Sequence, residues 1–261
     1  MINVAYLGDE SSHTYAAASA LFSEARFTGA ATVGGAAALL TDRAVDTAVI
    51  PIENSYGGTV AETLDALFAA DAYIVRQHFM PISHALIGYE GANPSIIKRV
   101  YSHPQALAQC GVYIGQNLKD ATLIPVKSTS EALGLIRGGE EAAIARGAGP
   151  GQAVLAAHIE DRKDNATRFI VLEAAPRFSG KNVSLMFEAR HRPGALFSAL
   201  RSLAENGVNL HKLESRPGRQ SAFRYRFYLE FMTDADKKGV MRILNDLSAR
   251  TELMKFLGMY E

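Results

Sequence analysis

The sequence predicts a protein of two parts, an α/β region followed by a smaller α+β unit. Four times in the first 135 residues, an apolar run of strand length ends at a polar turn and a helical pattern follows. Beyond Gly180 the pattern changes to strands of period two that alternate with amphipathic helices. A chain of 261 residues is long enough for two domains, and these two patterns divide it between them.

Each of the four units in the first part has the order strand, polar turn, helix. The predicted strands are 4–7, 47–52, 99–101 and 123–126, the turns are 11–14, 53–55, 102–104 and 128–130, and the helices extend to 22, 68, 110 and 136. Such alternation is typical of a mostly parallel sheet with helices on both faces. Because ligands bind such sheets beyond the carboxyl ends of the strands, we expect the polar turns to converge on one cleft.

Two of these helix starts have the spacing of a capping box, Thr59 with Glu62 and Ser128 with Glu131. Capping alone explains the Ser and Thr side chains there. The free N–H groups of a helix start also attract anions, so several starts facing one cleft would bind a carboxylate with few Lys or Arg residues. Both interpretations stay open from the residues alone.

The second part has the order βαββαβ in about 80 residues, which is typical of a ferredoxin-like unit. The predicted strands are 183–189, 208–213, 223–231 and 253–257, and the helices lie around 196–204 and 240–247. On the third strand, apolar residues alternate with Arg224, Arg226, Tyr228 and Glu230, which predicts one buried and one polar face. Residues 176–181 interrupt the periodicity and mark the boundary between the two parts.

Composition and charge exclude several classes of function. Lys and Arg together number 27, as do Asp and Glu, so no overall field attracts nucleic acid or an anionic membrane. No run approaches 18 apolar residues, and Asp9 and Glu10 interrupt the region where a signal peptide has its apolar run. With Cys110 as the single cysteine, we expect a cytoplasmic protein without disulfides.

The residues also contain no metal or nucleotide motif. The seven histidines are scattered without zinc-type spacing, so we expect no metal site. The glycine-rich segment 147–151 contains Pro150 and lacks the Lys-Ser/Thr of a phosphate loop, which predicts a turn. The residues alone therefore predict an α/β region with a cleft that binds a small anion, followed by a small α+β domain.

Several segments together resemble one family, the prephenate dehydratases. They are Pro51-Ile52-Glu53-Asn54-Ser55 with Gly58 and residues 62–65, Ser102-His103-Pro104-Gln105-Ala106-Leu107 with Gln109-Cys110, residues 128–132, and Asn165-x-Thr167-Arg168-Phe169. The C-terminal unit resembles the ACT regulatory domain of that family through residues 193–196 and 209–217. The segments follow the family's order and cover essentially the whole chain.

The resemblance implies that the chain decarboxylates and dehydrates prephenate to phenylpyruvate in phenylalanine biosynthesis, without a metal or an organic cofactor. It implies a catalytic domain over 1–176, built of two α/β lobes like a type II periplasmic binding protein. Lobe one would span about 1–76 and 160–176, lobe two about 77–159, and the ACT domain 182–261. Prephenate is a dianion, which suits a cleft lined by helix starts.

The resemblance also implies which side chains act. Thr167 would donate to the leaving hydroxyl or hold the water that does so, while Asn54, Ser102 and Gln109 would position substrate groups. A threonine hydroxyl is a poor acid, so polarisation is expected rather than outright proton loss. The remaining substrate-binding residues would be Ser12, Thr14, Ser55, His103, Arg168 and Phe169. Arg168 suits a substrate carboxylate and a structural salt bridge equally well, and Phe169 is expected as a packed wall.

The chain departs from the family pattern at two places. Where the family has Gly-Pro-x-Gly-Ser/Thr-Phe/Tyr-Ser, residues 8–14 read Gly-Asp-Glu-Ser-Ser-His-Thr. One hypothesis is that protonated His13 adds attraction for the dianion. The second departure is Arg146, which stands where a Ser usually follows Ala-Ile-Ala, and the sequence assigns no consequence to it.

In relatives the ACT module binds phenylalanine between paired modules, so we expect L-phenylalanine as an effector. The matching residues are Gly194, Ala195, Leu196, Asn209, Leu210, Glu214, Ser215, Arg216 and Pro217. The polar face of Arg224, Arg226, Tyr228 and Glu230 is expected to be the assembly surface of a homodimer or homotetramer.

Two alternatives stay open. An arogenate dehydratase would differ only by an amino group of the substrate, which these motifs do not resolve. A non-catalytic amino-acid-binding sensor would use the same cleft and module, but binding alone would not need the threonine of the 165–169 block. No fused chorismate mutase domain is expected, because the first strand begins three residues after Met1.

Overall fold

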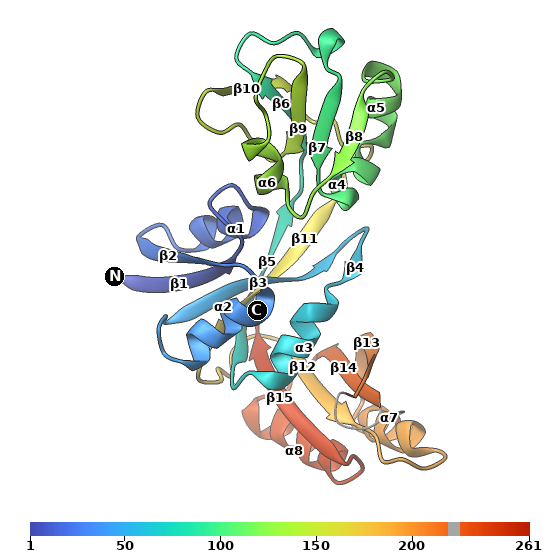
Figure 1. Ribbon diagram of the computed structural model, residues 1–261. Helices are drawn as coiled ribbons and strands as arrows, with labels where there is room; N and C mark the ends of the chain where they lie inside the picture. The colour runs from blue at the N-terminus through green and yellow to red at the C-terminus, as the bar shows by residue number, and fades with distance from the viewer. Residues whose placement is uncertain (219–224) are drawn as a thin grey trace.

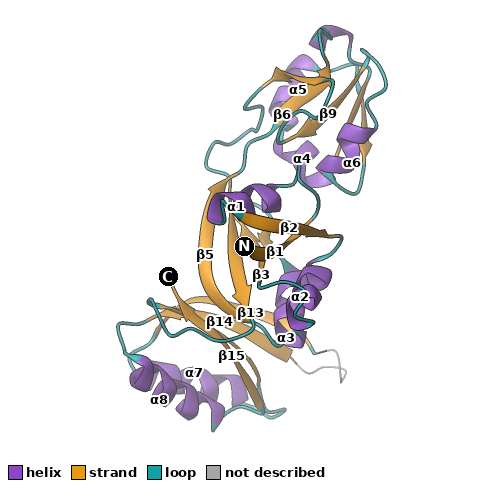
Figure 2. Cartoon of the chain, turned by 90° about the vertical axis from the view of Figure 1, so that its left-hand side faces the viewer, coloured by secondary structure: helices purple, strands orange, loops and turns teal. Residues whose placement is uncertain are grey.

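The computed structural model describes residues 1–218 and 225–261, and its three sheets follow one another along the length of the molecule (Figures 1 and 2). Two mixed α/β sheets form the two-lobed region that the sequence predicts, and an antiparallel four-stranded sheet with two helices forms the C-terminal unit. The predicted fold class is therefore confirmed.

The first lobe contains a six-stranded sheet with the order β2-β1-β3-β11-β5, in which β4 pairs with β3. Its strands are β1 (Ile2–Leu7), β2 (Ala25–Ala30), β3 (Thr47–Asn54), β4 (Gly58–Thr59), β5 (Tyr73–Pro81) and β11 (Ala166–Glu173). Strand β1 runs parallel to β2 and β3, whereas β11 is antiparallel to both of its neighbours. The sheet is thus mixed rather than mostly parallel, because β5 carries the chain out to the second lobe and β11 brings it back.

Three helices cover this sheet, α1 (His13–Leu21) on one face and α2 (Val33–Thr41) and α3 (Ala61–Ala69) on the other. The N-cap of α1 is Ser12, and α2 is capped by Thr32. The capping box expected at Thr59 is wrong, since α3 begins after Val60 and has no side-chain cap. Thr59 lies instead in β4, paired with Glu53.

The second lobe contains a five-stranded sheet with the order β10-β6-β9-β7-β8. Its elements are β6 (Ala85–Tyr89), a 3-10 turn (Pro94–Ile96), β7 (Arg99–Ser102), α4 (Pro104–Gln109), α5 (Gly111–Asn117), β8 (Thr122–Pro125), α6 (Thr129–Gly134), β9 (Glu141–Ala145) and β10 (Gln152–Ala156). The capping box at α6 is confirmed: Glu131 N donates to Ser128 Oγ at 3.0 Å. The segment 147–151 is the turn that joins β9 to β10.

The expected lobe boundary at residue 77 is wrong, because it falls in the middle of β5, which pairs with β11 as far as Pro81. The chain crosses between the lobes only after this strand and again before Ala166, where β11 begins.

The C-terminal sheet has the order β13-β14-β12-β15. Its elements are β12 (Asn182–Glu188), α7 (Ala195–Glu205), β13 (Asn209–Pro217), β14 (Tyr225–Met232), α8 (Lys237–Ser248) and β15 (Leu253–Tyr260). Both helices pack on one face of this sheet. Residues 223 and 224, expected at the start of the third strand, lie outside the described residues.

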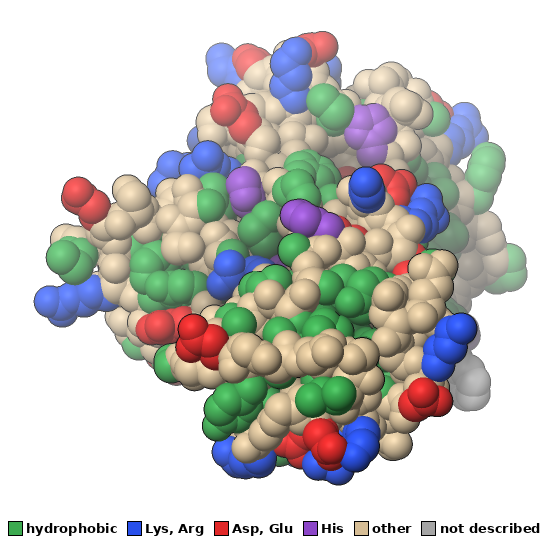
Figure 3. Space-filling view, turned by 90° about the horizontal axis from the view of Figure 1, so that it is seen from above, with side chains coloured by type: hydrophobic (Ala, Val, Ile, Leu, Met, Phe, Trp, Pro, Cys, Tyr) green, Lys and Arg blue, Asp and Glu red, His purple; other side chains and the backbone are tan. Residues whose placement is uncertain are grey.

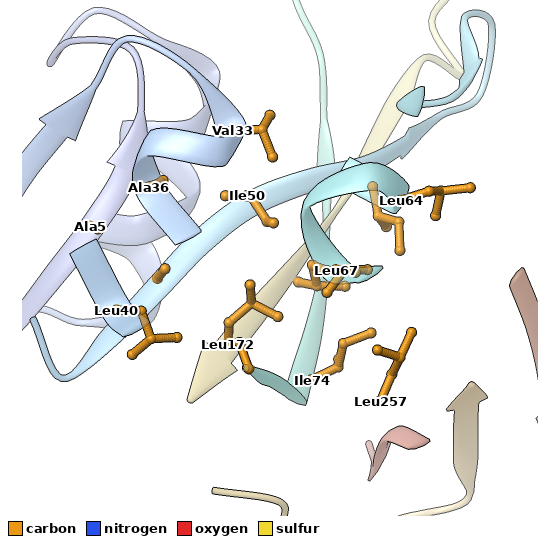
Figure 4. Packing of buried hydrophobic residues seen from close by; sticks show 14 of the residues in the cluster. Ala5, Val33, Ala36, Leu40, Ile50, Leu64, Leu67, Ile74, Leu172 and Leu257 are labelled. Atoms are coloured by element: carbon orange, nitrogen blue, oxygen red, sulfur yellow. The ribbon is translucent and has the colours of Figure 1, made fainter. Parts of the chain in front are cut away.

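The polar face of β14 is not the assembly surface that the alternation suggested. Arg226, Tyr228 and Glu230 are buried, since this face of the sheet packs against the first lobe of the same chain. Tyr228, Leu257 and Tyr260 join a core that includes Ile50 and Ile74 of the first lobe, and Figure 4 shows Leu257 beside Ile74. One hydrophobic core therefore spans the boundary between the first lobe and the C-terminal sheet, whose helix-covered face has a core of its own.

Strand β15 approaches β5 so closely that only glycine fits at one position. Gly258 has φ +153°, and a Cβ there would lie 2.0 Å from the carbonyl oxygen of Ile74. The sequence thus permits backbone contact between the two sheets. Within the described residues, no helix is long and apolar enough to cross a membrane.

Candidate active site

A cavity of about 410 Å³ lies between the two lobes. It is lined by Leu7, Gly8, Asp9, Ser12, His13, Thr14, Ala31, Pro51, Asn54, Val60, Ile82, His84, His103, Gln105, Ala106, Gln109, Lys127, Ser128, Thr129, Thr167 and Phe169. Three of these residues, Ser12, His103 and Ser128, are the N-caps of α1, α4 and α6. The polar turns of both lobes therefore converge on one cleft, as the alternation of strands and helices predicts.

Thr167 and Asn54 face each other across adjacent strands. The Nδ2 of Asn54 donates to the Thr167 hydroxyl oxygen at 3.0 Å, and the two residues are register partners in β11 and β3. The Oδ1 of Asn54 accepts from the backbone N–H groups of Tyr56 and Gly57, at 3.0 and 2.9 Å. These bonds fix the orientation of the amide, so the Thr167 oxygen accepts and its proton is left to donate.

A chain of side-chain hydrogen bonds continues from this pair into the second lobe. Asn54 Nδ2 also donates to Asn165 Oδ1 at 2.9 Å, and Asn165 Nδ2 donates to Gln109 Oε1 at 3.1 Å. The same Gln109 oxygen lies 2.9 Å from His84 Nε2. Since that oxygen is an acceptor, His84 carries its proton on Nε2. The network ties α4 of lobe two to the strands of lobe one.

Four of the other predicted substrate-binding residues lie at or beside the cavity. Ser12 lines it while its Oγ donates to Leu7 O and accepts from Tyr15 N. Thr14 and Phe169 are buried residues of its wall. Ser55 is not part of the lining, because its Oγ donates to Asn165 Oδ1 and accepts from Ala166 N.

Two predicted site residues point away from the cavity. Ser102 is fully buried, and its Oγ donates to the carbonyl oxygen of Ile144 at 2.6 Å, so it ties β7 to the end of β9. Arg168 lies on the opposite face of β11 from Thr167 and forms a salt bridge with Glu230 of the C-terminal sheet at 2.8 Å. Of the two interpretations of Arg168, the structure supports the salt bridge.

His13 occupies the cleft as a neutral imidazole. Burial, together with the neighbouring His84 and Arg146, lowers its pKa to about 4. The two histidine rings meet edge to face at 5.8 Å, and among the described residues no protein group bonds either ring nitrogen of His13. The lowered pKa argues against the hypothesis that a protonated His13 attracts the substrate.

Sequence reasoning missed several cavity residues, among them Lys127, Gln105 and His84. Lys127 directly precedes the predicted turn at 128–130, so the turn itself was the available signal. The structure also shows where the side chain of Arg146 lies. Its guanidinium donates to the carbonyl oxygens of Glu10 and Ser11, both at 3.4 Å. It therefore links the second lobe to the first loop of lobe one.

The charges around the site are mixed. On the face of the molecule seen from above, acidic and basic side chains are interspersed (Figure 3). Within the described ranges, no group of three or more His, Cys, Asp or Glu side chains is arranged to hold a metal ion. Burial raises the pKa of the Cys110 thiol to about 12, which keeps it protonated and unreactive.

A second cavity, of about 320 Å³, lies in the C-terminal unit beside the start of α7. It is lined by Ala189, Arg190, His191, Arg192, Pro193, Ala195, Leu196, Tyr225 and Phe227. Of the predicted effector-binding residues, Ala195 and Leu196 therefore line it, and Gly194 is the N-cap of α7 with φ +75°. The other six, Asn209, Leu210 and 214–217, lie on β13, where Glu214 and Arg216 contact the first lobe.

Comparison with known proteins covers both parts of the chain. The model of the family "Prephenate dehydratase" matches residues 4–177, and the model of the "ACT domain" matches residues 183–249. The bifunctional chorismate mutase/prephenate dehydratase of Aquifex aeolicus is 33% identical over 269 residues, covering 99% of this chain and 73% of that protein. The prephenate dehydratase of Methanocaldococcus jannaschii is 37% identical over 227 residues, covering 81% of this chain and 80% of that protein.

Among solved structures, the prephenate dehydratase of Arthrobacter aurescens in complex with L-Phe superimposes with a TM-score of 0.91. It is 31% identical, and the match covers 99% of this chain and 90% of that chain.

Proposed function

This chain belongs to the prephenate dehydratase family and has an ACT domain, and we propose that the cavity between its lobes is where prephenate is converted to phenylpyruvate. The observation that carries this assignment is the bond of 3.0 Å from Asn54 Nδ2 to the hydroxyl oxygen of Thr167. It leaves the threonine as a hydrogen-bond donor at the wall of a cleft of suitable volume.

The reaction needs orientation more than acid strength. Prephenate loses its ring carboxylate as carbon dioxide and its ring hydroxyl with a proton as water, and the electrons of the broken C–C bond complete the aromatic ring. Thr167 donates to the departing hydroxyl and stabilises the negative charge that develops on its oxygen. Asn54 and Gln109 hold the threonine and the cleft wall in place, so the bound substrate is kept close to the reacting geometry.

Groups at the cavity, rather than the net charge of the protein, attract the dianion. Lys127 and the N-termini of helices α1, α4 and α6 line the same cavity. Their N–H groups and partial positive charge attract carboxylates. Neutral His13, beside them, offers a donor and an acceptor for uncharged oxygens of the substrate.

The decisive experiment is incubation of the purified protein with prephenate, following phenylpyruvate formation at alkaline pH. We expect turnover in the wild-type protein and a loss of about 10²-fold or more in Thr167→Ala. Thr167→Ser keeps the hydroxyl and serves as the matched control, with most of the activity retained. An active Thr167→Ala protein of native fold would remove the threonine from this role.

Arogenate is the second candidate substrate, because it shares the ring, the ring carboxylate and the hydroxyl of prephenate. The two differ in the side chain, where arogenate has an ammonium group. Parallel assays with both compounds measure the preference as a ratio of kcat/KM values.

L-phenylalanine is the proposed effector of the ACT domain, supported by the L-Phe complex of the similar Arthrobacter protein. The cavity at the start of α7 offers a binding surface, and the residues on β13 would be supplied by a second subunit in a homodimer or homotetramer. Calorimetry with L-phenylalanine, run beside light scattering of the same sample, tests both points. A protein that neither binds phenylalanine nor self-associates contradicts this part of the proposal.

A further inference from the structure

The C-terminal sheet reaches the active-site strands through two ion pairs. Arg168 of β11 forms a two-bond contact with Glu230 of β14, at 2.9 Å from Nη1 and 2.8 Å from Nη2. Lys212 of β13 lies with its Nζ 2.8 Å from Glu53 of β3. Arg168 Nη2 also donates to Glu53 at 3.1 Å, so the four charges form one cluster. Both cations and Glu230 have side chains that are about nine-tenths buried.

The strand register puts this cluster directly behind the catalytic pair. Thr167 pairs with Asn54, and the next register partners are Arg168 and Glu53. Because successive side chains of a strand point to opposite faces, Thr167 and Asn54 face the cleft while Arg168 and Glu53 face the ACT sheet. Thr167 and Asn54 are therefore each bonded directly, through one peptide bond, to a residue that the ACT domain holds.

Glu230 is itself held by a buried set of hydroxyl groups. The Tyr228 hydroxyl contacts Glu230 and lies 3.2 Å from Ser184 Oγ, which in turn lies 2.8 Å from the Tyr260 hydroxyl. Burial would lower the pKa of Arg168, but hydrogen bonding and the charge of Glu230 raise it above its usual value. A two-bond arginine–carboxylate contact in such surroundings is sensitive to direction as well as distance.

We propose that Glu230 and Lys212 of the ACT domain are positioning residues for catalysis, which hold β11 and β3 where Thr167 and Asn54 enter the cleft. The active site is then complete only when the ACT sheet is docked. On the proposed feedback by phenylalanine, the same cluster carries the effect: a shift of β13 or β14 on effector binding moves Arg168 and Glu53, and with them the catalytic pair.

The chain offers a matched control for this test. Arg226 and Glu188 form another buried ion pair of the ACT sheet, with Nε 2.7 Å from Oε1. Arg226 also contacts the first lobe, since its guanidinium lies 3.4 Å from the centre of the Phe68 ring. This pair touches the domain interface at the end of α3 and not at the active-site strands. Glu188→Gln and Glu230→Gln therefore each replace the carboxylate of a buried ion pair by a neutral amide. The two ion pairs lie at different places of the same domain interface.

The experiment compares kcat and KM of these variants with prephenate, after circular dichroism and thermal melts show that each is folded at the assay temperature. Both variants lose thermal stability. Glu230→Gln lowers kcat by about tenfold or more with little change in KM, whereas Glu188→Gln keeps kcat within about twofold of wild type. Lys212→Met provides a second break in the cluster and lowers kcat in the same way. Equal kcat values for Glu230→Gln and Glu188→Gln would overturn the proposal.

A second arm measures regulation. Calorimetry gives the Kd of L-phenylalanine, and assays with increasing L-phenylalanine give its effect on rate. In Glu230→Gln we expect Kd within about threefold of wild type but a reduced effect on rate. A full wild-type response in this variant contradicts the coupling role. If the wild-type protein binds no phenylalanine, the feedback proposal fails, and the kcat comparison still decides whether the cluster positions the catalytic pair.

Discussion

Asn54 uses the two ends of its amide differently, and this determines the chemistry of its neighbour. The oxygen accepts two backbone N–H groups, so the nitrogen must face Thr167. A threonine that accepts from an amide nitrogen is polarised toward donation of its own proton. The cleft thereby contains a directed hydrogen-bond donor that is not a strong acid.

Asn54→Asp reverses this bond while it keeps the size and shape of the side chain. A carboxylate accepts the Thr167 proton instead of donating to the oxygen, so the substrate loses its donor. We expect kcat to fall by about 10²-fold and KM to change less. Steady-state assays with prephenate check this result. Asn117→Asp, in helix α5 of lobe two, is the control and should retain wild-type kcat.

His13 makes folding stability depend on pH. Its pKa falls from 6.5 to about 4 on burial, so the unfolded chain binds more protons than the folded protein between these values. The contribution of His13 to the free energy of unfolding is therefore fully present above about pH 7. It declines as the pH falls, by about 2 kcal/mol between pH 7.5 and pH 5. Urea midpoints at both pH values measure this decline. His13→Phe should show a shallower decline, and an unchanged slope would contradict the assignment.

At the scale of elements, a β-bulge in β3 sets the direction of Glu53 and Asn54. Phe169 pairs with Pro51 and Arg168 with Glu53, so the register passes over Ile52. A bulge re-aims the side chains that follow it. Pro51 lines the cavity, Ile52 and Glu53 face the other side, and Asn54 faces the cavity again.

This bulge explains a limit of sequence reasoning. Periodicity predicted the elements of the C-terminal unit, whereas in the first part it predicted β1, β3, β7 and β8 with helices α1, α3, α4 and α6 and missed β2, α2, β5, β6, β9 and β10. The polar turns that contain Ser12, His103 and Ser128 were expected to meet in one cleft. Periodicity assumes regular alternation, so it gives no sign of a skipped residue. The resemblance to the family assigned Ser102 to the site and left Arg168 open between a substrate carboxylate and a salt bridge. In the structure Arg168 pairs with Glu230 on the other face of the sheet, and Ser102 donates to the carbonyl oxygen of Ile144.

Arg146 connects the lobes by two long hydrogen bonds to the first loop. Replacement by Met removes these bonds and leaves the loop of residues 8–14 less constrained. We expect KM for prephenate to rise by about three- to tenfold, with kcat within about twofold of wild type. Lys98→Met removes an exposed ion pair with Glu140 in the same lobe and should change neither constant. A wild-type KM in Arg146→Met would show that this contact does not shape the cleft.

For the whole molecule, the shared core joins the ACT sheet to the first lobe. Sequence periodicity identified the apolar face of each sheet but not the partner of the polar one, because Tyr228 and Glu230 have the residue types of a solvated face. Their burial depends on Arg168, which lies 62 residues away from Glu230 in the chain. Pairings over such distances are set by tertiary packing and leave no local pattern.

This core predicts joint unfolding of the first lobe and the ACT domain. Leu257→Ala removes a fully buried side chain at their boundary and should cost about 2–5 kcal/mol. Scanning calorimetry should show one transition for both parts, shifted to lower temperature as a unit. Leu253→Ala, on the same strand but 44% exposed, should change stability by less than about 0.5 kcal/mol. Two separated transitions in the wild-type protein would contradict a common core.

Strand β11 lies between β3 and β5 in space, yet it is synthesised only after the whole second lobe. During synthesis, the edges of β3 and β5 that later pair with β11 have no partner strand. Such unpaired edges can pair with other chains and lead to aggregation. Strand β15, the final element, then closes the core with Leu257 and Tyr260. A chain that ends before β15 therefore lacks the fourth strand of the C-terminal sheet and also part of the core that packs against the first lobe.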